Sequence, residues 1–247
     1  MSRRPVLSWA DLMTLGNAAL GTTALLLVTR DLWLRPHSAP GTTVVDTACL
    51  LVVLAGVLDG LDGVVARRLG PSVVGARLDA ACDLLTFGAV PALLLGAVDA
   101  RRPPIWAGLA VAMAGTYLLA AVFRLARHAR SHDTRQRCFR GLPMPSAAAA
   151  SIAVVLVAPH DAAQLGLVAG VCLLMISEVP YPHPTRGTAS LIAAAIFALT
   201  AAVAGAIPVR IVAIIWLAVV PVIPLLPLVV EFPRRVLGSR REDPTLG

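Results

Sequence analysis

The chain has 247 residues, of which 57% are hydrophobic and only 14% are charged, and its mean hydropathy is +0.80. This composition excludes a soluble globular domain and predicts a polytopic membrane protein. The formal net charge is +7, but the arginines lie between apolar runs, which favours topology-setting charge over nucleic-acid binding. We therefore expect an all-α membrane helix bundle that forms one integral domain over residues 1–247, with membrane lipids and no nucleic acid as partners.

Eight apolar runs approach the roughly 20 helical residues that cross a bilayer. If the N-terminus is cytoplasmic, 16 of the 21 arginines fall on the cytoplasmic side of the membrane. The positive-inside rule therefore predicts a multi-pass protein with both termini, and the loop after the second run, in the cytoplasm. The runs are 10–29, 45–67, 75–98, 104–127, 146–158, 162–178, 187–206 and 210–231.

The first run carries two polar residues, Thr14 and Asn17, one turn apart near its cytoplasmic end. Polar side chains in an apolar helix are unfavourable unless they face a partner. They either form hydrogen bonds between helices or contact a functional site at this edge of the membrane.

Four acidic residues mark the end of the second run and the start of the third: Asp59, Asp62, Asp79 and Asp83. The spacings of three and four residues place each pair on one helix face. Because a short loop joins the two helices, we expect antiparallel neighbours whose acidic faces meet. Four carboxylates at low dielectric repel one another unless cations neutralise them, and hard oxygen ligands suit magnesium, calcium or manganese. Two divalent ions would balance the four charges, which suggests phosphoryl or phosphatidyl transfer.

The stretch around these acids resembles the signature of the CDP-alcohol phosphotransferases. These integral membrane enzymes transfer a substituted phosphate from a CDP-linked donor to an alcohol and release CMP. The resemblance implies a six-helix catalytic core and a homodimer, with the runs at about 187–231 as additional C-terminal helices. The spacing between the motif arginine and the next motif glycine is one residue shorter than usual. The pattern reads Asp59-x2-Asp62-Gly63-x2-Ala66-Arg67-x7-Gly75-x3-Asp79-x3-Asp83.

Carried over residue by residue, the resemblance implies a two-metal site for magnesium or manganese. All four motif aspartates would be metal ligands, and Asp83 would also be the general base that takes the proton from the acceptor hydroxyl. For Gly60 and Gly63, close helix packing is the alternative to binding, and for Arg67 it is snorkelling to the interface. The residues implied to bind the CDP-alcohol are Gly63, Ala66, Arg67, Ser72 and Gly75.

Three later stretches resemble the CDP-diacylglycerol–serine O-phosphatidyltransferase subfamily of these enzymes. Residues 84–92 are similar to its run after the last acid, with Thr86 in place of serine. Residues 123–127 and 139–147 match two further motifs in order, whereas Glu178 stands where arginine is frequent in the subfamily. The resemblance therefore implies CDP-diacylglycerol and L-serine as substrates.

Serine needs a cation for its carboxylate, and the candidates are Arg124, Arg127 and Arg140. They would bind that carboxylate or the donor phosphate; the alternative is charge that only sets topology. Inositol-phosphate and glycerol-phosphate acceptors stay open because an arginine-rich segment would also suit a phosphate. A cation-coupled transporter is the alternative from another class, although acids gathered at one membrane edge favour an enzyme.

Overall fold

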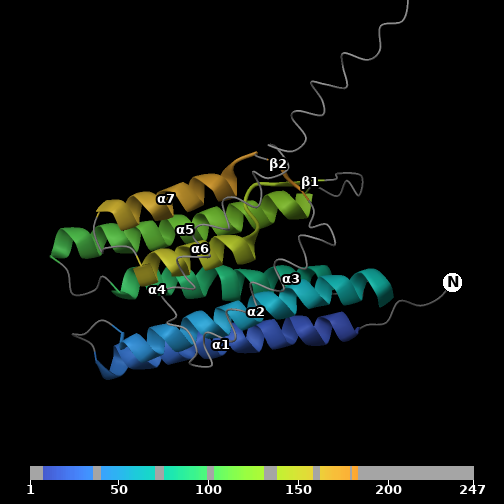
Figure 1. The fold of residues 1–247 in the computed structure, drawn as a ribbon, viewed down its shortest axis with the longest axis horizontal. Helices are drawn as coiled ribbons and strands as arrows, with labels where there is room; N and C mark the ends of the chain where they lie inside the picture. Colours follow the sequence, from blue (N-terminus) through green and yellow to red (C-terminus); the bar gives the residue numbers. More distant parts are fainter. Residues whose placement is uncertain are drawn as a thin grey trace, which may run out of the picture.

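The computed structural model describes residues 8–35, 40–69, 75–98, 103–130, 138–157, 162–178 and 180–182. Their helices lie roughly side by side, and α1 and α2 form one side of the bundle (Figure 1). The third apolar run is one continuous helical segment in three parts, α3, a π-helical turn η1, and α4. The elements are α1 (Trp9–Leu34), α2 (Thr42–Leu69), α3 (Gly75–Asp83), η1 (Leu84–Ala89), α4 (Val90–Val98), α5 (Pro104–Arg130), β1 (Cys138–Arg140), α6 (Met144–Val157), α7 (Ala162–Ile176) and β2 (Pro180–Pro182).

The helical bundle confirms the expected all-helical membrane fold. Four segments are long and apolar enough to cross a membrane, and α6 and α7 are shorter apolar helices. The runs expected at 187–206 and 210–231 lie outside the described residues, so the count of eight spans stays a prediction. The four long segments are Asp11–Leu34, Thr42–Asp62, Gly75–Val98 and Pro104–Ala129.

Helix α6 forms the centre of the bundle. Nine of its 14 residues are buried, and it contacts α2, α4 and α7. Its alanines allow neighbouring helix backbones to approach closely, as small residues do in membrane helix packing. In Figure 1, α6 lies between α5 and the α3–α4 segment. A short central helix therefore supports the segment that carries two of the acids.

The outer surface of the bundle is apolar, as a lipid-facing surface must be. Trp9 and Trp33, near the two ends of α1, are 70% and 80% exposed. Tryptophan is enriched at both membrane–water interfaces, so α1 has the exposed aromatic ends of a spanning helix. Leu26 of α1 and Leu119 of α5 are also largely exposed. Several polar side chains, among them Thr14, Asn17 and Asp62, are instead buried inside the bundle.

The π-helical turn η1 directly follows Asp83, and two interhelical hydrogen bonds hold it. The buried Tyr117 hydroxyl of α5 donates to the Phe87 carbonyl at 2.8 Å, and the Thr86 hydroxyl donates to the Asn17 carbonyl of α1 at 3.3 Å. Gly21 of α1 allows this approach, because a Cβ there would collide with the Thr86 side chain. Single π-turns within helices frequently accompany functional sites. Here the turn fixes the helix end that carries Asp83.

The expectation of helices alone missed one short antiparallel ribbon, in which β1 pairs with β2. Beside it, Gly141 adopts a φ of +79°, and a Cβ there would lie 2.5 Å from both Arg127 Nη2 and the Met175 carbonyl oxygen. The Arg127 guanidinium donates to the carbonyls of Ile176 at 2.7 Å and Met175 at 3.1 Å. The end of α5 is thereby fastened to the end of α7.

Candidate active site

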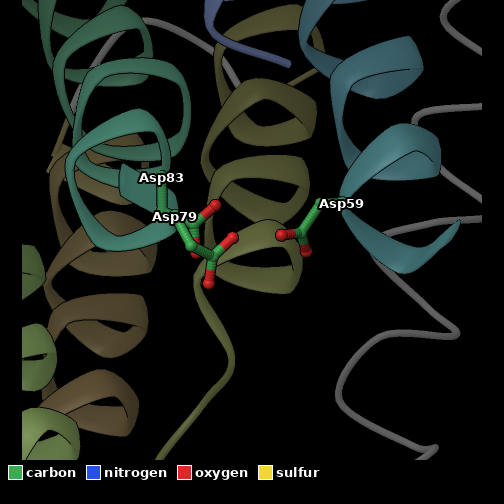
Figure 2. Close-up of side chains that lie close together, drawn as sticks. All are labelled: Asp59, Asp79 and Asp83. Atoms are coloured by element: carbon green, nitrogen blue, oxygen red, sulfur yellow. The ribbon is translucent and has the colours of Figure 1, made fainter. Parts of the chain in front are cut away.

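Three carboxylates from α2 and α3 converge beside α1, which packs against both helices. Asp59 is on α2, and Asp79 and Asp83 lie one turn apart on α3. One carboxylate oxygen of each lies within 4.8 Å of the others, and all three side chains are partly buried. Figure 2 shows the three carboxyl groups pointing toward one another. The predicted meeting of two acidic helix faces is therefore present for these three residues.

The fourth acid, Asp62, lies beside this cluster and is buried. Its Oδ2 accepts a hydrogen bond from the Thr14 hydroxyl at 2.9 Å, and its charge is close enough to interact with Asp59. Asp62 thus borders the three-carboxylate cluster, and its role as a metal ligand stays a prediction.

A second residue of α1, Asn17, reaches the cluster. Its Nδ2 donates to Asp83 Oδ1 at 3.4 Å, and its side chain is fully buried. The sequence left open whether Thr14 and Asn17 bond another helix or contact a functional site. Both are true, because each donates to an acid of the site on a neighbouring helix.

Arg124 of α5 supplies positive charge to the cluster. Its mostly buried guanidinium interacts electrostatically with Asp83 and with Asp59. Its buried Nε has no hydrogen-bond partner among the residues that the structure describes. Arg127, one turn further along α5, is instead engaged with the end of α7. From the sequence, Arg124 and Arg127 had the same candidate role, but the structure gives them different partners.

The donor set fits a divalent cation. Within the described residues, the buried Oδ1 of Asp79 has no hydrogen-bond partner, although it lies in a cluster of like charges. A buried acceptor without a partner is unfavourable, and so is the convergence of carboxylates without a cation. Carboxylate oxygens are the ligands that hard cations such as magnesium and manganese prefer. The cluster of Asp59, Asp79 and Asp83 can therefore hold such an ion.

The residues predicted to bind the CDP-alcohol are only partly described. Gly63, Ala66 and Arg67 belong to the last turns of α2, and Gly75 is the first residue of α3. The side chains of residues 63–69 and the whole of Ser72 lie outside the described residues, as does the side chain of Arg140 in β1. Their roles stay predictions.

The sequence motif did not identify two groups that shape the site. Tyr117, which holds the π-turn after Asp83, had only one signal in the sequence, a polar aromatic residue within an apolar helix. Thr86 was noted for its resemblance to a subfamily motif, whereas its bond to the Asn17 carbonyl depends on how α1 packs.

A helical membrane bundle with a partly buried carboxylate cluster suited to divalent cations has the features of an intramembrane transferase that uses such cations. A family model for CDP-alcohol phosphatidyltransferase matches residues 7–179. The chain belongs to this family of transferases.

Several named relatives are similar to the chain over most of its length. An archaetidylserine synthase of Methanothermobacter thermautotrophicus is 30% identical over 179 residues, covering 70% of this chain and 69% of that protein. The CDP-diacylglycerol–serine O-phosphatidyltransferase of Bacillus subtilis is 29% identical over 175 residues, covering 70% and 88%. The enzyme of the same name from Methanocaldococcus jannaschii is 29% identical over 187 residues, covering 75% and 79%.

Proposed function

We propose that this protein transfers a phosphatidyl group from CDP-diacylglycerol to the hydroxyl of L-serine, giving phosphatidylserine and CMP. The observation that carries the proposal is the convergence of Asp59, Asp79 and Asp83 beside the Arg124 guanidinium. Carboxylates support a cation-assisted attack on a diphosphate, and a nearby arginine supports an acceptor that bears a carboxylate. The names of the similar proteins agree with serine as the alcohol.

Two divalent cations, magnesium or manganese, would be held by the four motif aspartates and would neutralise the charge of the diphosphate. Asp83 takes the proton from the serine hydroxyl, since a neutral hydroxyl is a poor nucleophile. The serine oxygen then bonds to the phosphorus that carries diacylglycerol, the phosphoanhydride bond breaks, and CMP leaves. The Asn17 side chain donates to Asp83 Oδ1 and would help to orient the proposed base. The donor would be bound by Gly63, Ala66, Arg67, Ser72 and Gly75.

We assign the serine carboxylate to Arg124. The Arg124 guanidinium interacts electrostatically with the proposed base, whereas Arg127 already donates to two backbone carbonyls. A bidentate guanidinium suits a carboxylate, and the hydroxyl and carboxylate of serine are close enough to reach neighbouring groups. Arg140 remains a candidate for the donor phosphate.

The proposed reaction takes place at the cytoplasmic edge of the membrane. The arginine distribution favours both termini and the α2–α3 connection on that side. Thr14 and Asn17, which contact the acids, also lie near the N-terminal end of α1. A soluble amino acid and a nucleotide headgroup can arrive there while the acyl chains stay in the bilayer. We further propose a homodimer, as the family resemblance implies.

Purified protein supplied with CDP-diacylglycerol and manganese or magnesium tests the proposal. L-serine, inositol phosphate and glycerol phosphate are offered separately, and CMP release is measured for each. We expect CMP release with serine alone. Release only with a phosphorylated acceptor would retain the family chemistry and reject serine, whereas absence of CMP with every alcohol would reject the proposed reaction.

A further inference from the structure

Helix α1 lies outside the acidic motif, yet two of its side chains end on the acids. Thr14 donates to Asp62 Oδ2 at 2.9 Å, and Asn17 donates to Asp83 Oδ1 at 3.4 Å. Both donors are buried, with Thr14 at 3% and Asn17 at 0% exposure. About one helical turn separates Thr14 from Asn17, and about one turn separates the two acids on each acidic helix. One face of α1 therefore serves both acidic helices.

Asn17 is also held through its backbone. Its carbonyl accepts from the Thr86 hydroxyl, and Thr86 lies three residues beyond Asp83 on the same helical segment. Gly21, one turn further along α1, is the position where a Cβ would collide with Thr86. The backbone and side chain of Asn17 are thus fixed against the segment that presents Asp83.

The Asn17 amide is only half satisfied. Its Oδ1 is buried and has no hydrogen-bond partner in the described part of the chain. A buried acceptor left in this way destabilises a fold, whereas an apolar residue of the same shape does not carry that penalty. An apolar residue would serve better for helix packing alone. The amide at this position therefore indicates that its Nδ2 donor is used at Asp83.

We propose that Thr14 and Asn17 are positioning residues that orient the carboxylates of Asp62 and Asp83 for cation binding and proton transfer. Groups that hydrogen-bond to metal ligands set the orientation of those ligands, and their loss typically weakens metal affinity about 10- to 100-fold. The proposal rests on the cation site proposed above and is independent of the identity of the acceptor alcohol.

The decisive variant is Asn17→Leu, which keeps the shape of the side chain and removes both polar atoms. We expect the melting temperature of the purified protein in detergent to change little, because the unpaired Oδ1 is removed while Asp83 Oδ1 loses the Nδ2 donor. We also expect the dissociation constant for manganese, measured by the electron paramagnetic resonance of free Mn²⁺, to increase about 10- to 100-fold. The kcat for CMP release should fall by a similar factor, while the KM for CDP-diacylglycerol stays within about threefold.

Thr14 provides an independent pair of variants. Thr14→Val removes the hydroxyl at constant shape and should weaken manganese binding, whereas Thr14→Ser keeps the donor and should restore it. The matched control is Thr23→Val, because Thr23 is an exposed α1 residue whose hydroxyl donates to the Ala19 carbonyl of its own helix. This control should leave the manganese affinity and kcat at wild-type values.

Two results would overturn the proposal. One is manganese affinity and kcat that stay at wild-type values in both Asn17→Leu and Thr14→Val. The other is a fall in melting temperature that accompanies every loss of activity, with unchanged manganese affinity, which would make these residues contacts between helices only. If the wild-type protein itself binds no manganese, the proposed function fails at its cation site, and this outcome differs from either of the two.

Discussion

The two ends of the α1–α2 pair carry acids in opposite circumstances. At the end where α1 connects to α2, Asp31 accepts hydrogen bonds from the Arg35 guanidinium and from the Gly41 backbone N–H, the latter at 2.9 Å. At the other end Asp59 faces Asp79 and Asp83, and the described residues give the buried Asp79 Oδ1 no partner. The first acid is neutralised by Arg35 and also accepts from the Gly41 backbone. The cluster of Asp59, Asp79 and Asp83 has an acceptor without a partner among the described residues and can bind an added cation.

This contrast makes a general distinction between acids in a membrane helix bundle. An acid with a protein cation and a backbone donor stabilises local structure modestly, since exposed ion pairs contribute little. Acids that converge and are only partly neutralised, as these are by Arg124, destabilise the fold unless a cation binds, and groups placed in this way are typical of functional sites. The predictions below test whether the two ends differ in this sense.

The largest effect should follow from Asp83→Asn. The amide keeps the shape of the side chain, but it cannot take the proton from an alcohol, and it is a poorer cation ligand. We expect CMP release to fall about a thousandfold or more, because loss of a general base alone accounts for about 10²- to 10⁴-fold. The protein should still insert into membranes, which fractionation and size-exclusion chromatography in detergent verify. Turnover near the wild-type rate would remove Asp83 from the base role.

Removal of divalent cations should affect the acidic cluster and leave the Asp31 end of the α1–α2 pair unchanged. Chelation of divalent ions should abolish CMP release, and added manganese or magnesium should restore it. Asp79→Asn should weaken manganese binding at least about 10- to 100-fold, because it replaces a buried carboxylate in the cluster. Asp31→Asn at the other end is the matched control and should bind manganese with wild-type affinity. Equal affinities for all three proteins would contradict a cation site at the cluster.

Arg124 and Arg127 lie on the same helix, and their substitutions should have different effects on serine binding and on stability. Arg124→Gln should raise the KM for serine about 10- to 100-fold, the loss expected for a hydrogen bond to a charged group. Arg127→Gln should lower the melting temperature, because it frees the carbonyls of Met175 and Ile176, while the serine KM stays close to wild type. Steady-state kinetics and thermal unfolding in detergent measure both. A serine KM that responds to Arg127 and ignores Arg124 would reverse the assignment.

The sequence predicted the helices and the acidic cluster because both depend on local spacing. Long apolar runs specify spanning helices, and acids three or four residues apart share a face. Asp59, Asp79 and Asp83 therefore met as expected. The two acidic helices are consecutive in the chain, and α1 packs against both of them, so the acids of α2 and α3 meet beside α1.

The sequence could not predict features that depend on packing between distant segments. Arg124 and Arg127 both point from one side of α5, and only the position of the end of α7 decides which one is engaged. The π-turn at residues 84–89 depends on the Tyr117 hydroxyl, which lies 30 positions from its acceptor Phe87. Thr14 and Asn17 could be identified as polar residues in need of partners, whereas the identity of those partners required the fold.

Gly141→Ala tests the fastening of α5 to α7 by a smaller effect. The new Cβ would lie 2.5 Å from Arg127 Nη2 and from the Met175 carbonyl oxygen, and the φ of +79° is unfavourable for alanine. We expect a loss of about 1–2 kcal/mol in the free energy of unfolding from the backbone alone. Thermal unfolding checks this loss, and Gly166→Ala is the control, because nothing lies within 4 Å of a Cβ at that position.

The smallest effect belongs to the paired acid, Asp31. Asp31→Asn removes the charge that Arg35 pairs with but keeps an oxygen that can accept from the Gly41 N–H. Because exposed ion pairs contribute little to stability, we expect the melting temperature to change by less than about 2 °C and CMP release to stay within about twofold of wild type. A large loss of activity from this variant would mean that the α1–α2 connection is coupled to the acids at the opposite end of the bundle. Asp31, which is paired with Arg35, would then not be functionally independent of the acidic cluster that is proposed to bind a cation.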